Sequence, residues 1–201
     1  MKKLTFLVIL LTILGINAMA QEISKPRPTT QGVIIGMTLT TIKGDVDGTT
    51  KIRNGATAGL FFTYSLLPAF DIQPEILYCQ KGTNVNDNGY IKLNYVTLPV
   101  LLKYKSPARG LVAPTFFAGP ELGILLSAKI NKGDAETDYG YYLKNFDWGF
   151  SFGVGIDVRL LSLKLMLDAR YTFGLTNMVH DPGSGDSLKN SAFMLTAGLG
   201  F

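Results

Sequence analysis

One group of polar residues near the C-terminus has side chains of the types that hydrolases use. His180 is the only histidine of the chain, and Asp181, Ser184, Asp186 and Ser187 follow it closely. A histidine, an acid and a serine could supply the base, the orienting group and the nucleophile of a hydrolase or acyltransferase. The segment also contains one proline and two glycines. This composition is typical of turns, so the sequence favours a solvated turn over a catalytic site.

Oxygen ligands and a single thiol are the other candidates for chemistry. Residues 44–48 and 84–89 are rich in Asp and Asn, which calcium prefers, but neither stretch completes a twelve-residue calcium loop. Cys79 is the only cysteine, so it has no partner for an internal disulfide and is expected to be a small buried side chain. We therefore expect no catalytic residue, cofactor or metal ion.

The first twenty residues have the parts of a secretory signal peptide. Lys2 and Lys3 precede an apolar run over residues 4–16, and Ala18-Met19-Ala20 forms a cleavage site. The run is shorter than the ~20 residues of a transmembrane helix. Cleavage would remove two lysines and no acid, so the formal net charge falls from +4 to +2. This is too low for a nucleic-acid-binding protein.

The elements that must position these residues are strands. Charged residues make up only 17% of the chain, against roughly 25% in soluble domains. Apolar residues alternate with period two, which is typical of strands with two different faces. One register is almost wholly apolar, and the other holds Gly, Thr and a few charges. The alternating segments are residues 32–43, 55–65, 70–82, 92–105, 113–129, 146–159, 163–176 and 190–201.

These segments favour a membrane barrel over a soluble barrel or sandwich. A soluble barrel would carry many Lys and Glu on its outer face, whereas small and polar groups suit the lumen of a narrow membrane barrel. Polar connections at 44–54, 83–91, 130–145 and 177–189 alternate with short ones at 66–69, 106–112 and 160–162. The predicted fold is all-β, an eight-stranded antiparallel up-and-down transmembrane β-barrel. We expect a signal peptide at 1–20, a short periplasmic segment at 21–31 and the barrel at 32–201, with both termini periplasmic.

Aromatic residues of the apolar register gather near the ends of the expected strands. Interfacial girdles of this kind flank the apolar band of membrane barrels. The expected periplasmic girdle contains Tyr64, Phe70, Tyr104, Phe116 and Phe201, and the outer girdle contains Tyr78, Trp148, Phe173 and Phe193.

Charges on the lumenal register are expected to plug the barrel. An eight-stranded barrel has room for side chains and little else, and an unpaired buried charge is costly. Only glycine and serine occupy the lumenal positions 149–155, and this gap should let Arg170 reach Glu121 or Glu75. Separate hydration of each charge by trapped water is the alternative. The expected polar network contains Glu75, Lys103, Glu121, Asp157, Asp168 and Arg170, with Lys164 in a lower layer beside Lys103 and Asp157.

Four stretches resemble a known family. Residues 71–82, 93–104, 119–123 and 169–177 are similar to small Gram-negative outer-membrane β-barrel proteins, often labelled porin-family or PorT-like. Thr97 and Cys79 depart from the acid and the serine expected at those positions. The resemblance implies an outer-membrane barrel inserted by the barrel-assembly machinery, with the C-terminal Phe201 as an assembly signal. It implies no single activity.

The leading hypothesis is a non-enzymatic integral outer-membrane barrel with a structural or surface-interaction role. Its partners would be outer-membrane lipid and lipopolysaccharide and a surface or secretion-system protein. A narrow channel for ions or small solutes is the alternative, and a lipid- or peptide-processing enzyme is a weaker one. A rigid lumenal plug favours the first hypothesis, an open polar path the second, and a lumenal His–acid–Ser cluster the third.

Overall fold

A computed structural model describes residues 29–43, 50–85, 89–106, 111–132, 136–138, 143–160, 162–178 and 188–201. Within these residues no helix is long and apolar enough to cross a membrane. Two strands are short, β2 (Thr50–Lys51) and β7 (Glu136–Asp138). The long strands are β1 (Thr29–Lys43), β3 (Arg53–Leu67), β4 (Phe70–Val85), β5 (Gly89–Lys105), β6 (Val112–Lys132), β8 (Phe146–Leu160), β9 (Leu163–Gly174) and β10 (Lys189–Gly200).

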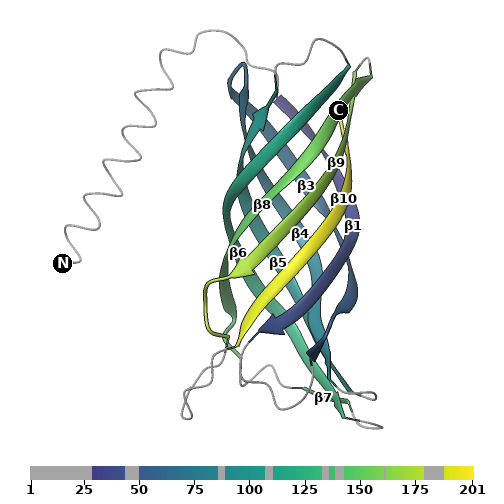
Figure 1. Ribbon diagram of the computed structural model, residues 1–201, viewed down its shortest axis with the longest axis vertical. Coiled ribbons are helices and arrows are strands. Elements are labelled where there is room, and N and C mark those ends of the chain that lie inside the picture. The colour runs from purple at the N-terminus through teal and green to yellow at the C-terminus, as the bar shows by residue number, and fades with distance from the viewer. Residues whose placement is uncertain are drawn as a thin grey trace, which may run out of the picture.

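The eight long strands that the described residues form close into a barrel (Figure 1). Each pairs antiparallel with the next, and β1 pairs with β10 from Gly32↔Gly200 to Lys43↔Lys189. This confirms the predicted eight-stranded antiparallel barrel. Closure pairs the backbone groups of the long strands, which lipid could not hydrogen-bond.

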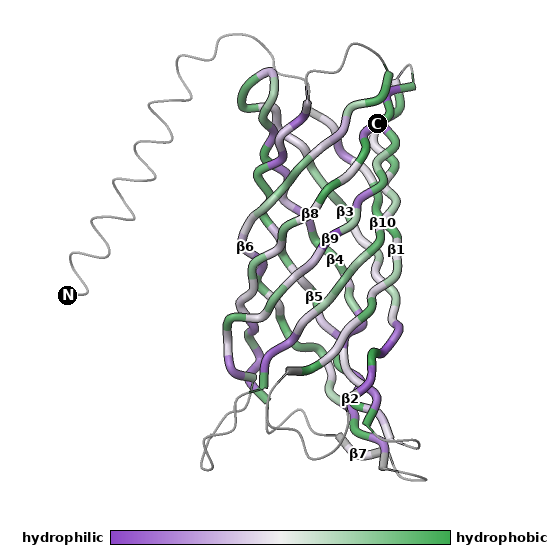
Figure 2. Tube along the Cα trace, in the orientation of Figure 1, coloured by the Kyte–Doolittle hydropathy of each residue, from purple (hydrophilic) through white to green (hydrophobic). Residues whose placement is uncertain are grey.

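Side chains alternate between the outer surface and the interior. Ile35 is 63% exposed and Leu60 is 58% exposed, whereas the adjacent Ile34 and Phe61 are 1% and 3% exposed. Figure 2 shows hydrophobic and hydrophilic residues alternating along the strands. A continuous apolar outer face is the surface that the hydrocarbon region of a membrane requires.

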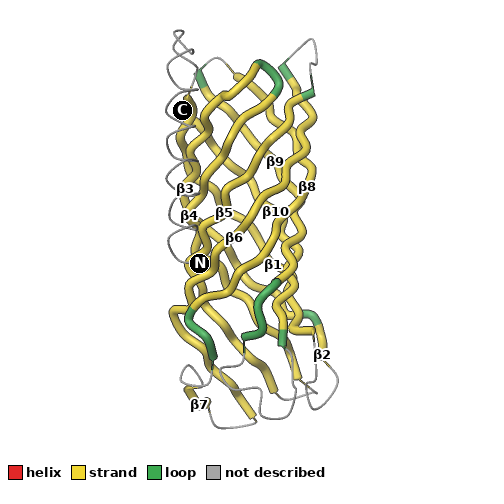
Figure 3. Tube along the Cα trace, turned by 90° about the vertical axis from the view of Figure 1, so that its left-hand side faces the viewer, coloured by secondary structure: helices red, strands yellow, loops and turns green. Residues whose placement is uncertain are grey.

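The strands extend farther toward the long connections than the sequence predicted. The connection expected at 83–91 is mostly strand, because β4 and β5 pair as far as Val85↔Gly89. β6 continues to Lys132 and pairs with β7, and β2 pairs with the end of β4. β2 and β7 both lie at this end of the barrel (Figure 3). At other boundaries, β1 begins at residue 29 rather than 32 and β9 ends at 174 rather than 176.

A β-bulge in β6 reverses its inward and outward positions. Asn94 faces Ser127 in the ladder but Tyr95 faces Leu125, so Leu126 is an extra residue. Beyond the bulge the inward position falls on Ala128, which is fully buried. The continuous alternation predicted through residue 129 is therefore wrong past Leu126, since a bulge shifts the two-residue period by one.

Candidate functional site

The interior of the barrel is the candidate site, because it contains the charged residues that the sequence assigned to a network. Strand alternation turns these side chains inward, and all of them are almost fully buried. They lie in groups that follow one another along the barrel, from the short turns toward the long connections. The exposed fractions are 3% for Glu75, 0% for Lys103, 2% for Glu121, 2% for Asp157, 5% for Asp168 and 1% for Arg170.

The first group lies beside the short turns. Lys103 Nζ is 2.9 Å from Asp157 Oδ1 and 3.5 Å from Asp168 Oδ1. Lys164 Nζ is 2.8 Å from Asp157 Oδ2. A further ion pair joins Lys105 Nζ to Asp71 Oδ1 at 2.6 Å. Three ammonium groups thus face three carboxylates, which offsets part of the cost of burying them. We call these residues the short-turn cluster: Asp71, Lys103, Lys105, Asp157, Lys164 and Asp168.

A bidentate ion pair occupies the middle of the interior. The terminal nitrogens Nη1 and Nη2 of Arg170 lie 2.7 Å from Glu75 Oε2 and 2.9 Å from Glu75 Oε1. Gln73 Nε2 donates a further hydrogen bond of 2.8 Å to Glu75 Oε1. Neither charged side chain is exposed. The sequence left Glu121 and Glu75 open as partners of Arg170, and the structure pairs Arg170 with Glu75 in the two-bond geometry that arginine favours.

Phe117 fills the gap that the sequence left along β8. Its ring centroid lies 5.4 Å from Arg170 Cζ and 5.7 Å from Lys103 Nζ, within cation–π distance of both. A Cβ atom on Gly153 would come within 2.6 Å of this ring. Glycine therefore admits the aromatic ring. The sequence expected these small residues to let Arg170 reach Glu121 or Glu75, and Arg170 does pair with Glu75; the Phe117 ring lies beside it, which the sequence did not anticipate.

A second ion pair lies nearer the long connections. Lys81 Nζ is 3.0 Å from Glu121 Oε1. Ser151 Oγ and Thr172 Oγ1 donate hydrogen bonds of 2.8 Å and 3.3 Å to Glu121 Oε2. The adjoining pocket encloses about 10 Å³. The sequence placed Lys81 on the lumenal register but not in the network, because spacing along one strand does not reveal the height of a partner across the barrel.

An apolar cluster lies in the interior on the long-connection side. Met178 lies beside Tyr95, and Asn190 Nδ2 is 2.8 Å from both Met178 Sδ and Asp147 Oδ2. The backbone N–H of Met178 donates to the carbonyl of Leu188 at 3.0 Å, which holds the segment in place. The buried members of the cluster are Ile42, Leu93, Tyr95, Ala128 and Met178.

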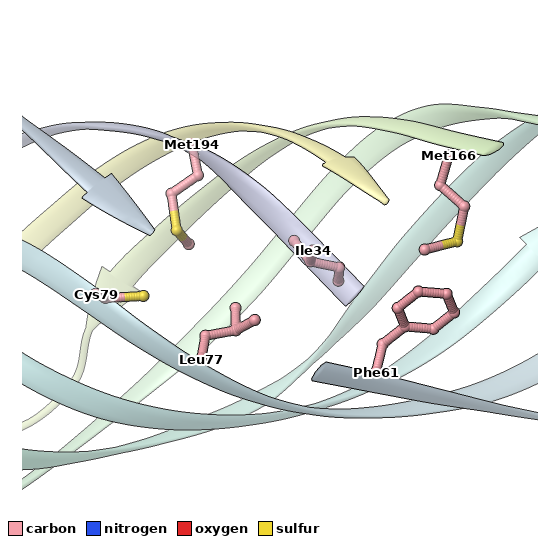
Figure 4. Close-up of a cluster of buried hydrophobic side chains, with 6 residues drawn as sticks. All are labelled: Ile34, Phe61, Leu77, Cys79, Met166 and Met194. Atoms are coloured by element: carbon pink, nitrogen blue, oxygen red, sulfur yellow. The ribbon is translucent and has the colours of Figure 1, made fainter. Parts of the chain in front are cut away.

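A second apolar cluster corrects the expectation of a small and polar lumen. Its side chains come from β1, β3, β4, β9 and β10 and point toward one another (Figure 4). The interior therefore holds large apolar residues as well as ion pairs, and β4 and β9 contribute side chains to both. Side chains that fill the interior of a narrow barrel pack closely in this way. The members are Ile34, Phe61, Leu77, Cys79, Met166 and Met194.

The residues considered for catalysis and metal binding form no reactive arrangement in the described part of the chain. His180 and residues 44–48 lie outside it, as do the central residues of 84–89. Cys79 is fully buried, with its Sγ 3.1 Å from Thr57 Oγ1 and 3.5 Å from Thr97 Oγ1. No group of three or more His, Cys, Asp or Glu in the described ranges could hold a metal ion.

Aromatic side chains on the outer surface approach one another near both ends of the strands. Toward the short turns, the Tyr104 ring lies 5.3 Å from Phe70 and 6.5 Å from Phe116. On β8 and β9, Phe173 lies 5.9 Å from Phe150, which the sequence did not assign to a girdle. The remaining girdle residues are also exposed: Tyr64 by 36%, Tyr78 by 40%, Trp148 by 53%, Phe193 by 37% and Phe201 by 62%.

Comparisons with known proteins agree with this architecture. The model of the outer membrane protein beta-barrel domain matches residues 19–180. No curated protein sequence matches the chain. Neisserial surface protein A is 11% identical with a TM-score of 0.54, covering 85% of this chain and 97% of its own. Ail, the attachment invasion locus protein of Yersinia pestis, is 16% identical with a TM-score of 0.49, covering 86% and 98%. At these identities the likeness concerns the fold alone.

Proposed function

Because the chain belongs to the family of outer membrane protein β-barrel domains, we propose that it is a non-enzymatic integral outer-membrane protein with a structural or surface-interaction role. The observation that carries the proposal is the filled interior. Ion pairs and Phe117 occupy its middle, and the pocket beside Lys81 and Glu121 encloses about 10 Å³. That is about the space of one water molecule, which leaves no room for a solute at this level.

The end with the long connections is the proposed interaction surface. There β4 and β5 pair as far as Val85↔Gly89, and β2 and β7 widen the sheet. We place this end outside the cell and both termini in the periplasm, as in other outer-membrane barrels. The signal peptide would direct export and be cleaved after Ala20, in a segment outside the described residues. A surface or secretion-system protein is the proposed class of partner, and the PorT-like label remains a prediction.

Conductance tests the closed interior. Purified protein refolded and added to a planar lipid bilayer is expected to give little or no current, because paired charges and apolar side chains fill the lumen. Current should be recorded over a range of voltages, with a heat-unfolded sample of the same preparation as the control. Steady and large single-channel currents from the folded protein would contradict the proposal and favour the channel for ions or small solutes.

Deletion of Phe201 tests its proposed role in assembly. The N–H of Phe201 donates to the carbonyl of Gln31 at 2.8 Å, and its ring faces outward. We expect the deletion to lower the yield of folded barrel, measured by heat-modifiable migration on a gel. Phe201→Ala keeps the backbone bond and removes the ring, so it should lower the yield as well, whereas Phe201→Tyr should not. Normal insertion of the deletion variant at native expression would refute the role.

A further inference from the structure

Three prolines lie inside adjacent strands on one side of the barrel. They are Pro74 of β4, Pro99 of β5 and Pro120 of β6. Each belongs to one of the stretches that carry the family resemblance, at residues 71–82, 93–104 and 119–123. Proline has no backbone N–H, so within sheets it is normally confined to edge strands and bulges. A closed barrel has no edge, and the function proposed above gives these prolines no role.

Each proline coincides with a gap in a backbone ladder, and the register is the same on both sides of every gap. The pairs that border the gaps are Phe61↔Glu75 and Tyr64↔Ile72 in β3 and β4, Pro74↔Val100 and Leu77↔Thr97 in β4 and β5, and Pro99↔Glu121 and Leu102↔Ala118 in β5 and β6. A proline at a hydrogen-bonded position leaves the carbonyl opposite it without a ladder donor. The carbonyls concerned, those of Phe62, Glu75 and Val100, are exceptions to the pairing that barrel closure provides.

The remaining five ladders between the long strands are continuous throughout the described residues. The ladder of β6 and β8, for example, runs from Val112↔Val158 to Ile124↔Phe146 without a gap. It contains a proline of its own, Pro114, which faces Ile156. Alternate residues of an antiparallel strand give no hydrogen bond to a given neighbour, so a proline is harmless at those positions. The missing bonds are therefore confined to one wall, formed by β3, β4, β5 and β6.

The first gap lies midway across the apolar band. Pro74 is four residues from Phe70 of the periplasmic girdle and four residues from Tyr78 of the outer girdle. No water is available at that depth to hydrate a free carbonyl. A pocket of about 440 Å³ lies at the same place, and its lining includes the outward Phe62 and Pro74 as well as the buried Glu75. The wall is thus both hollowed and less hydrogen-bonded at this point.

Two interior ion pairs connect the strands of the interrupted wall. Lys81 of β4 reaches across β5 to Glu121 of β6, with 3.0 Å between Nζ and Oε1. Arg170 of β9 joins Glu75 of β4, with 2.7 Å between Nη1 and Oε2. The second pair links the interrupted wall to the continuous one. Both glutamates directly follow a proline in the sequence, so each carboxylate acts beside a gap.

We propose that the wall of β3, β4, β5 and β6 is a lateral seam, which opens locally toward the membrane at the three prolines. The ion pair of Arg170 and Glu75 holds the seam closed from inside. Opening brings the buried side chains of Phe61, Glu75 and Leu77 to the hydrocarbon region while the continuous ladders stay intact. The inference goes beyond the proposed function, because it depends neither on the orientation of the barrel nor on conductance along its axis.

Amide hydrogen exchange tests the seam. The mature barrel in phosphatidylcholine nanodiscs is transferred to deuterated water, and exchange is followed at each residue by NMR. Leu60↔Ile76 and Tyr64↔Ile72 remain paired on either side of the first gap, so exchange of these amides requires the strands to separate. We expect them to exchange at least about ten-fold faster than amides around Ala169 and Leu195, because local opening is easiest where a ladder has fewest bonds.

Variants that restore a donor identify the prolines as the cause. Pro74→Val and Pro120→Val each return an N–H group to the ladder. Each should slow exchange at the neighbouring gap about two- to ten-fold, the effect of one net hydrogen bond. Pro114→Val is the matched control and should leave exchange at the gaps unchanged, because its ladder is already continuous. Glu75→Gln removes the charge that holds Arg170, so it should speed exchange at the seam more than around Ala169.

Three results would overturn the proposal. The first is equal protection of the two walls in the wild type. The second is fast exchange at the seam that neither Pro74→Val nor Pro120→Val slows, since the prolines would then not be its cause. The third is an equal acceleration of all strands by Glu75→Gln, which would show that the ion pair stabilises the whole barrel and does not hold one wall closed.

Discussion

Replacing Arg170 with alanine is expected to lower the free energy of unfolding by about 3–5 kcal/mol, the usual cost of leaving one partner of a buried ion pair alone. Arg170 makes two bonds to Glu75, at 2.7 Å and 2.9 Å, and neither side chain is exposed. The variant leaves the Glu75 carboxylate in the interior with only the Gln73 amide as a donor among the bonds described above. Urea titration of the refolded barrel in lipid vesicles, followed by tryptophan fluorescence, measures the loss.

Matched variants separate the ion pair from the size of the side chain. Arg170→Met combined with Glu75→Leu removes both charges and keeps most of the volume, so the double variant should recover much of the lost stability. Lys51→Ala removes an exposed cation and should change stability by no more than about 0.5 kcal/mol. A loss for Arg170→Ala as small as that for Lys51→Ala would show that trapped water, rather than pairing, stabilises the buried charges.

The fold could be predicted from sequence because lipid imposes a strict pattern. Where strands cross the hydrocarbon region, every outward position must be apolar, so the register of Ile35 or Leu60 is visible without coordinates. Past the apolar band no such constraint acts. The backbone ladder of β4 and β5 continues there to Val85↔Gly89, although Asn, Asp and Gly make the stretch read as a loop. The bulge at Leu126 was hidden for a related reason, since Leu125 and Leu126 are both apolar.

The sequence identified which charged residues face the interior of the barrel, but not which of them pair with each other. Alternation assigns Glu75, Lys81, Glu121 and Arg170 to the interior, because a charge on the outer face would meet lipid. Which of them meet depends on the stagger between strands, which no single strand encodes. In the structure Lys81 pairs with Glu121, which the sequence analysis had considered as a partner of Arg170. The position of Phe117 was not predicted either. Nothing in the sequence links this aromatic residue of β6 to Gly153 of β8, whose lack of a side chain makes room for the ring.

Replacing Phe117 with alanine is expected to destabilise the barrel by about 3–5 kcal/mol, the usual cost of removing a buried aromatic ring. The ring is 4% exposed and lies between Arg170 and Lys103, so its loss leaves a cavity beside two cations. Phe116→Ala is the matched control. It removes the same ring from the neighbouring residue, but Phe116 is 55% exposed on the lipid-facing side, so a smaller loss is expected. Urea titrations of both variants in the same vesicles provide the comparison. Equal losses would mean that the Phe117 ring contributes no more to stability inside the barrel than an aromatic ring does on its outer surface. A clearly larger loss for Phe117→Ala would support the close-packed interior on which the expected lack of conductance depends.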